Sequence, residues 1–135
     1  MKGYVDGFVI PIKKKNVKAY LKMARLGCRI WMKYGALDYW ECVGDELTVK
    51  MGPPESSPRP MSPFIKKFSL KPDETVIFSW ILFKSKAHRN SVNAKVMKDP
   101  AMQMENFDPK EMPFDDKRML YGGFSPIVSA KRRRA

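Results

Sequence analysis

The chain has 135 residues, of which 44% are hydrophobic, and this is enough for one core of ordinary size. Its longest apolar run, Val76 to Phe83, has eight residues, whereas a membrane helix needs about 20. The first eight residues include Asp6 and two glycines, so they lack the uninterrupted apolar stretch of a secretory signal. We therefore expect a single domain over residues 1–130 that does not cross a membrane and remains in the cytoplasm.

The charge is strongly positive and unevenly distributed. A formal net charge of +12 comes from 26 basic and 14 acidic residues, and residues 118–135 contribute five basic residues and no acidic one. Residues 131–135 form a basic tail that contains Lys131, Arg132, Arg133 and Arg134. Such charge attracts polyanions and also keeps a small protein soluble. One histidine and two distant cysteines form no ligand cluster, so we expect neither a metal nor a cofactor.

The N-terminal region predicts a strand followed by a helix. Tyr4 to Ile12 alternates like a strand with two apolar faces, and Pro11 is expected to fray its end. From a cap at Asn16, apolar residues recur at helical spacing until Gly35. The outer positions of this helix form a basic ridge of Lys18, Lys22, Arg25, Arg29 and Lys33. The ridge and the tail are candidate polyanion contacts, and solvated surface is the alternative.

The rest of the chain predicts three further strands and a second helix. These elements are a strand over 36–44, a strand over 75–83, a helix over 85–99 capped by Ser85, and a strand over 119–128. Between the second and third strands, residues 46–63 are rich in proline and predict an exposed loop. A short helix or turn at 64–68 would close it. The glycine pair at 122–123 predicts a bulge or a close backbone approach.

The order β-α-β-β-α-β is that of the ferredoxin-like fold. This is an α+β arrangement in which two helices cover one face of a four-stranded antiparallel sheet. The third strand is apolar on both faces, with Val76, Phe78, Trp80 and Leu82 on one and Ile77, Ile81 and Phe83 on the other. Soluble proteins avoid a large bare apolar face. We therefore expect a homodimer in which the helix-free face packs against the sheet of a second copy.

Asp6 is the least expected residue of the first strand because it lies between apolar neighbours. A buried carboxylate needs a partner or a shifted pKa, and either could serve proton transfer. Arg118 is the predicted partner, because the first and last strands are neighbours in this topology. A structural ion pair is the alternative to a catalytic one.

Three aromatic residues are candidates for lining a ligand pocket, with ordinary core packing as the alternative: Trp40, Trp80 and Tyr121. Glu41 and Asp45 lie near the end of the second strand, and we expect both to be solvated. No phosphate-binding glycine loop, nucleophile elbow or paired-carboxylate spacing is present in the sequence.

Six strings spread along the chain support a family resemblance. They are YVDGF at 4–8, GAL at 35–37, ECVGD at 41–45, DETVIFSW at 73–80, NAKVMKDPAM at 93–102 and MPFDDKRMLYGGFSPIV at 112–128. In these strings the chain resembles the YbaA-like family of uncharacterised bacterial proteins, within the dimeric α+β barrel superfamily. The resemblance implies a ferredoxin-like protomer that pairs through its sheet. It transfers no catalytic residue, and the proline-rich loop, residues 105–111 and the tail depart from the family pattern.

Three functions are compatible with these observations. The first is binding of a small apolar or aromatic molecule, with cofactor-independent oxygenase or isomerase chemistry suggested by other branches of the superfamily. The second is non-specific binding of nucleic acid or another polyanion, which would weaken steeply with salt. The third is a non-catalytic accessory role.

Overall fold

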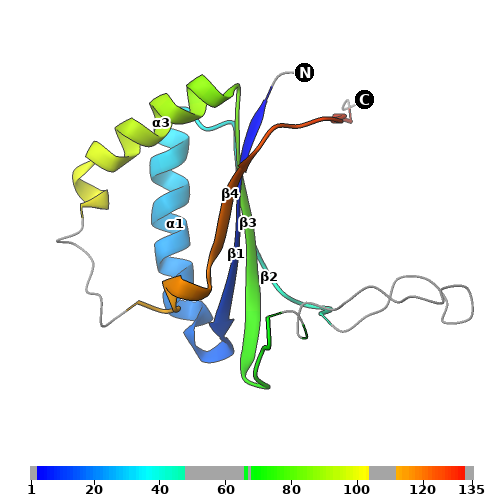
Figure 1. Ribbon diagram of the computed structural model, residues 1–135. Helices are drawn as coiled ribbons and strands as arrows, with labels where there is room; N and C mark the ends of the chain where they lie inside the picture. Colours follow the sequence, from blue (N-terminus) through cyan, green and yellow to red (C-terminus); the bar gives the residue numbers. More distant parts are fainter. Residues whose placement is uncertain (1–2, 48–65, 67, 104–111, 133–135) are drawn as a thin grey trace, which may run out of the picture.

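A four-stranded antiparallel sheet with two helices on one face forms the frame of the protein (Figure 1). The computed structural model describes residues 3–47, 66, 68–103 and 112–132. The main elements are β1 (Tyr4–Lys13), α1 (Val17–Lys33), β2 (Asp38–Val43), β3 (Glu74–Phe83), α3 (Lys86–Lys98) and β4 (Leu120–Phe124). The predicted α+β class, with four antiparallel strands and two helices, is confirmed.

The strands are hydrogen-bonded in the order β2-β3-β1-β4, so β1 and β3 are central. Their ladder runs from Tyr4 opposite Phe83 to Lys13 opposite Glu74. The fraying predicted at Pro11 is wrong, because β1 continues past it to Lys13. β1 pairs with β4 only from Val5 to Val9. At Pro11 the strand therefore has a free edge on the β4 side, where a residue without an N–H is tolerated.

Alternate residues of the strands form the core with the helices. On β3, Ile77 and Ile81 are 3% exposed and Phe83 is fully buried. Ile77 belongs to a core cluster with Tyr20 and Ala24 of α1, whereas Ile81 and Phe83 pack with Ile30 of α1 and with residues of α3. The sequence left open which face of the third strand meets the helices, and the structure assigns it to this set.

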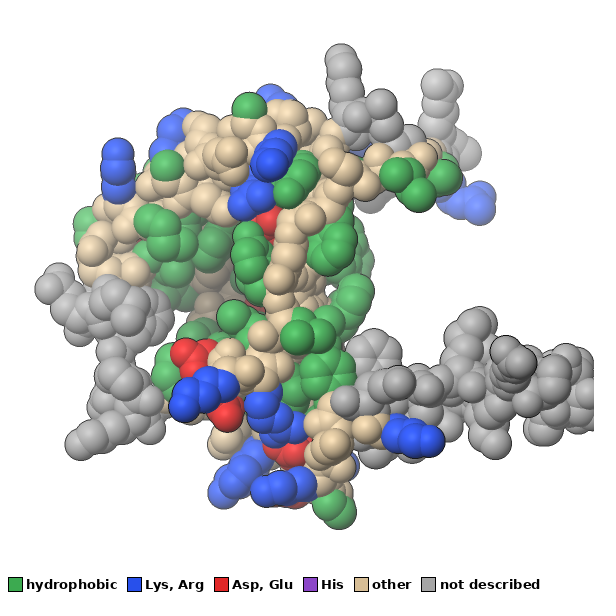
Figure 2. Space-filling model, viewed as in Figure 1, with side chains coloured by type: hydrophobic (Ala, Val, Ile, Leu, Met, Phe, Trp, Pro, Cys, Tyr) green, Lys and Arg blue, Asp and Glu red, His purple; other side chains and the backbone are tan. Residues whose placement is uncertain are grey.

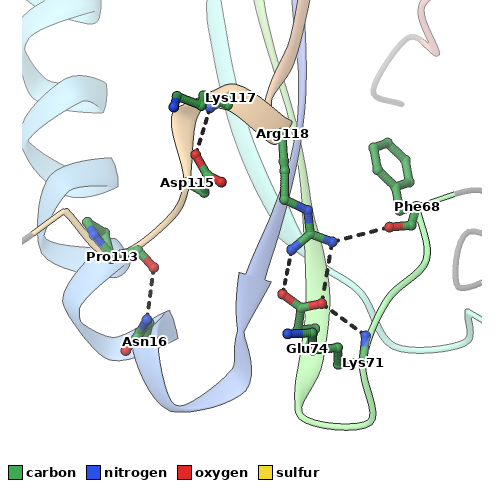
Figure 3. A network of polar contacts seen from close by, with 8 residues as sticks. All are labelled: Asn16, Phe68, Lys71, Glu74, Pro113, Asp115, Lys117 and Arg118. Carbon is green, nitrogen blue, oxygen red and sulfur yellow. Dashed lines mark hydrogen bonds and ion pairs between the residues drawn. The ribbon is translucent and has the colours of Figure 1, made fainter.

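The two helix starts differ in how they are capped. Ser85 caps α3 as predicted, since its Oγ accepts a hydrogen bond from the His88 N–H at 3.0 Å. Asn16 is the N-cap residue of α1 as predicted, but its side chain makes no capping hydrogen bond, and a 3₁₀ turn over Lys14–Asn16 leads directly into the helix. The Asn16 side chain instead donates to the Pro113 carbonyl at 3.0 Å (Figure 3). That hydrogen bond holds the start of α1 against the segment that precedes β4.

No helix of the described residues lies on the second sheet face, and we call it the open face (Figure 1). Its large apolar side chains are about half exposed: Phe78 49%, Trp40 54%, Leu120 57% and Phe124 59%. Trp40 and Trp80 stack across β2 and β3, with ring centroids 5.9 Å apart and an interplanar angle of 10°. A hollow of about 620 Å³ lies over β1, β3 and β4 on this side. The open face is therefore an extended apolar surface.

The glycine pair of β4 keeps a regular register with β1, so no bulge forms there. A Cβ at Gly123 would collide with the Tyr4 hydroxyl. The predicted close backbone approach is therefore present.

The structure also differs from the sequence prediction at the end of the last strand. β4 ends at Phe124 rather than near Val128. The predicted proline-rich loop and the turn at 64–68 lie outside the described residues, apart from positions 46, 47, 66 and 68. No helix in the described part of the chain is long and apolar enough to cross a membrane.

Candidate functional site

A cavity of about 240 Å³ lies between α1 and the inner face of the sheet. Residues of α1, β1, β2 and β3 line it, together with Met102, Phe114 and Met119. Five of its lining residues are aromatic: Phe8, Tyr20, Trp31, Tyr39 and Phe114. Figure 2 shows hydrophobic side chains around a hollow between α3 and the turn before β4. Such a concave, largely apolar space with few polar groups is typical of a small-molecule site.

Glu41 provides the charged group of this cavity. The Tyr20 hydroxyl lies 2.8 Å from Oε1 and 3.0 Å from Oε2 of Glu41, and the Tyr39 hydroxyl lies 3.3 Å from Oε2. Tyr39 and Glu41 are two positions apart on β2, so both point to the inner face. The expectation that Glu41 is solvated is therefore wrong, because α1 covers this end of β2 and brings Tyr20 to the carboxylate.

The two tyrosines act as hydrogen-bond donors to Glu41. Burial, followed by the negative charge of Glu41, raises the pKa of both Tyr20 and Tyr39 far above the usual tyrosine value. Both hydroxyls therefore keep their protons at neutral pH. Among the described residues, no lysine or arginine forms an ion pair with Glu41. Phenol groups rather than a cation thus stabilise this carboxylate.

Gly27 explains how Tyr39 reaches its position. A glycine inside a helix is unfavourable by about 1 kcal/mol relative to alanine, yet Gly27 lies in the middle of α1 and is buried. A Cβ at this position would lie 2.7 Å from the Tyr39 hydroxyl oxygen. The missing side chain makes room for the hydroxyl that donates to Glu41.

A second buried polar cluster surrounds Asp6, which is 1% exposed. The predicted partner is wrong: Arg89 of α3, not Arg118, places its Nε 3.7 Å from Asp6 Oδ1. Asn93 Nδ2 lies 3.5 Å from Asp6 Oδ2, and Asn93 in turn accepts a hydrogen bond from Trp31 Nε1 at 2.9 Å. Asp6 Oδ1 and Arg89 Nε have no hydrogen-bond partner. Because Trp31 lines the cavity, this network supports the cavity wall from behind.

Arg118 pairs with Glu74 at the opposite end of the sheet (Figure 3). Its Nη1 lies 2.6 Å from Glu74 Oε2, and its Nη2 donates to the Phe68 carbonyl at 3.2 Å. The strand register explains why Arg118 pairs with Glu74 and not with Asp6. Gly123 lies opposite Asp6 on β4, and Arg118 precedes that strand, so it lies near the end of β3 that carries Glu74.

The three aromatic candidates do not surround a common cavity. Trp80 lines the hollow of the open face and Trp40 stacks on it, whereas the side chain of Tyr121, which is paired with Phe8 across β4 and β1, points to the helix side of the sheet. Tyr121 also contacts Phe8, with ring centroids 4.8 Å apart, and its hydroxyl lies 3.4 Å from Arg89 Nη1. The cavity between α1 and the sheet is lined by other aromatic residues.

The basic candidates lie on two separate surfaces. All five side chains of the ridge on α1 are exposed, although Lys33 Nζ pairs with Asp99 at 3.2 Å. In the tail, Lys131 and Arg132 are exposed, whereas Arg133 and Arg134 lie outside the described residues. The chain after β4 leads away from the helix side of the sheet (Figure 1). Among the described residues, the ridge and the pair Lys131 and Arg132 therefore do not form one continuous basic surface.

The described residues contain no cluster of side chains suited to binding a metal ion. No group of three or more histidine, cysteine, aspartate or glutamate side chains is arranged there to hold an ion. Glu41 is bonded to tyrosines and Asp6 faces an arginine.

Together these features define an α+β protein with an apolar open sheet face and an aromatic cavity that contains one carboxylate. Residues 3–116 match the family described as a protein of unknown function, DUF1428, and the chain belongs to this family. It is 36% identical over 125 residues to uncharacterized protein YbaA of Escherichia coli K12, of Escherichia coli O157:H7 and of Shigella flexneri. The match covers 93% of this chain and 97% of each relative. The resemblance to a YbaA-like family is confirmed.

Proposed function

We propose that the chain is a ferredoxin-like protomer of a homodimeric α+β barrel, and that the cavity between α1 and the sheet binds a small, largely apolar or aromatic molecule. The cavity carries this proposal. It is somewhat smaller than the usual range for drug-sized ligands, about 300 to 1,000 Å³, so its volume of about 240 Å³ suits a molecule built around one ring. Glu41 with its two tyrosines supplies the few polar groups that would orient such a molecule.

The open face supports the dimer. Its half-exposed aromatic and aliphatic side chains lie on β2, β3 and β4, and such a surface is typical of an interaction site. From the pair Val5–Leu82 to the pair Pro11–Val76, the described residues on this face include no lysine or arginine. A chain with a formal net charge of +12 repels its own copies, and a face without basic residues is where a second copy can approach most closely.

Glu41 is also the group in the cavity that could accept a proton from a bound molecule. Cofactor-independent oxygenases and isomerases occur in other branches of the proposed superfamily, and both require such a proton transfer at some step. The support for this chemistry is analogy of fold together with one carboxylate in the cavity. Binding is therefore the part of the proposal to test first.

Ala24→Leu is expected to weaken binding of a small aromatic probe such as phenethyl alcohol by at least about tenfold. Ala24 lines the cavity and is 7% exposed, so a larger side chain there fills the space that the ligand needs. Titration followed by protein NMR shifts would give the dissociation constants. Ala19→Leu is the matched control, because Ala19 lies on the exposed side of the same helix. Equal binding by both variants would place the ligand elsewhere.

Polyanion binding is the second candidate, favoured by the exposed ridge on α1. Because the ridge on α1 and the described start of the tail, Lys131 and Arg132, lie on different sides of the sheet, we expect weak binding without sequence preference. Anisotropy of a labelled single-stranded oligonucleotide at increasing salt should show a steep loss of affinity. Removal of residues 131–135 should reduce the salt slope and leave the fold unchanged. A sequence-selective complex that persists at high salt would contradict this expectation.

A further inference from the structure

We infer that the cavity selects an organic cation, an amine or quaternary ammonium group attached to a small apolar or aromatic body. This inference rests on the proposed function, since it concerns the ligand of the same cavity. Three features of the cavity support it: an unbalanced carboxylate, free acceptor capacity on that carboxylate, and the aromatic rings around it.

The first feature is the charge of Glu41. It is the one acidic or basic residue among the described residues that line the cavity. No described lysine or arginine forms an ion pair with it. The basic ridge lies on the outer side of α1, where solvent and salt screen its charges over about 8 Å. The interior of the cavity therefore has a local negative charge in a protein with a formal net charge of +12.

The second feature is the small number of hydrogen bonds that the Glu41 carboxylate accepts from the protein. The hydroxyls of Tyr20 and Tyr39 supply one proton each, although three oxygen pairs lie within 2.8 to 3.3 Å. An ionised carboxylate has about four acceptor positions. About two of these stay available to N–H groups of a ligand.

The third feature is the aromatic lining. Tyr20 and Tyr39 are bonded to the carboxylate itself, and Phe8, Trp31 and Phe114 line the same space. The faces of aromatic rings attract cations, most strongly where water is excluded, and aromatic cages are a recurring means of binding quaternary ammonium groups. A carboxylate in a cavity lined by these rings attracts the charge, and the rings accommodate the apolar substituents.

Three probes with one body and different head groups test this inference: phenethylamine, phenethyl alcohol and phenylacetate. We expect the amine to bind about tenfold more tightly than the alcohol, and the acid to bind most weakly. The net charge of the protein alone would give the opposite order. Titrations followed by NMR shifts of the unmodified protein give this comparison without any substitution.

Glu41→Gln should abolish the preference for the amine, so that the ratio of the amine and alcohol affinities falls to about one. Asp38→Asn is the matched control, since it removes one negative charge from an exposed position of the same strand and should keep the preference. Equal affinities of amine and alcohol for the unmodified protein would overturn the inference and leave the proposed function standing. A preference that depends on Asp38 rather than Glu41 would overturn it as well. Failure of all three probes to bind would overturn both proposals.

Discussion

Ile81→Asp is expected to unfold the protomer, whereas Phe78→Asp is expected to leave it folded and to dissociate the homodimer that we propose. The two residues are three positions apart on β3 and point to opposite faces of the sheet. Ile81 is 3% exposed and packs under the helices, while Phe78 is 49% exposed on the open face. An unpaired charge buried in the core costs several kcal/mol, and domains of this size are stable by only about 5 to 15 kcal/mol.

Circular dichroism reports the fold of the two variants, and sedimentation velocity reports their mass. Met97→Asp is the control for Phe78→Asp, because Met97 is a similarly exposed apolar residue, 57% exposed, on α3. We expect this control to remain a folded dimer. If Phe78→Asp sediments like the unmodified protein with equal stability, the open face is not the dimer interface.

Arg89→Met is expected to reduce the free energy of unfolding by about 3 to 5 kcal/mol, because it leaves the Asp6 carboxylate buried without its cation. Asp6 is 1% exposed, and its remaining polar neighbours among the described residues would be the uncharged Asn93 amide, at 3.5 Å, and the Tyr121 hydroxyl. Arg89 also donates to the Tyr4 hydroxyl at 3.1 Å and lies over the Tyr4 ring. Urea unfolding at neutral pH measures the loss.

A second variant separates the effect of the buried charge from that of lost packing. In the background of Arg89→Met, Asp6→Asn keeps the shape of the side chain and removes its charge. We expect the double variant to regain much of the lost stability, since an apolar or neutral replacement of a whole buried pair is often tolerated. A double variant less stable than Arg89→Met alone would show that Asp6 is stabilised without Arg89.

Alternation along the strands predicted much of this sheet. It placed Ile77, Ile81 and Phe83 on one face of β3 and Phe78 with Trp80 on the other, and the structure has the same division. Which set meets the helices could not be predicted, because both sets are apolar and their exposure depends on where α1 and α3 pack. The Ser85 cap was predictable, since it depends on local sequence alone.

The polar partners were predicted poorly because they depend on register and on contacts distant in sequence. Arg118 and Arg89 were both available to Asp6, and the pairing of Gly123 with Asp6 on β4 keeps Arg118 away. Glu41 was missed although its position two residues after Tyr39 places both on one face. Its acidity and its place near a strand end favoured a solvated interpretation, and the approach of Tyr20 from α1 has no signal in the sequence.

β3 links the two parts of the proposal, because it contributes to both faces of the sheet. Ser79 and Ile81 line the cavity, and Phe78 and Trp80 belong to the open face. Dimer formation and ligand binding are therefore separable by substitution. We expect Phe78→Asp to dissociate the dimer and Ala24→Leu to affect the cavity alone.

Sedimentation velocity of the unmodified protein at micromolar concentration tests the central claim most directly, namely that a second copy covers the open face. We expect one species with twice the chain mass of 15.6 kDa. A stable, soluble monomer at that concentration would contradict it, because the half-exposed aromatic side chains of the open face would then face water without a partner.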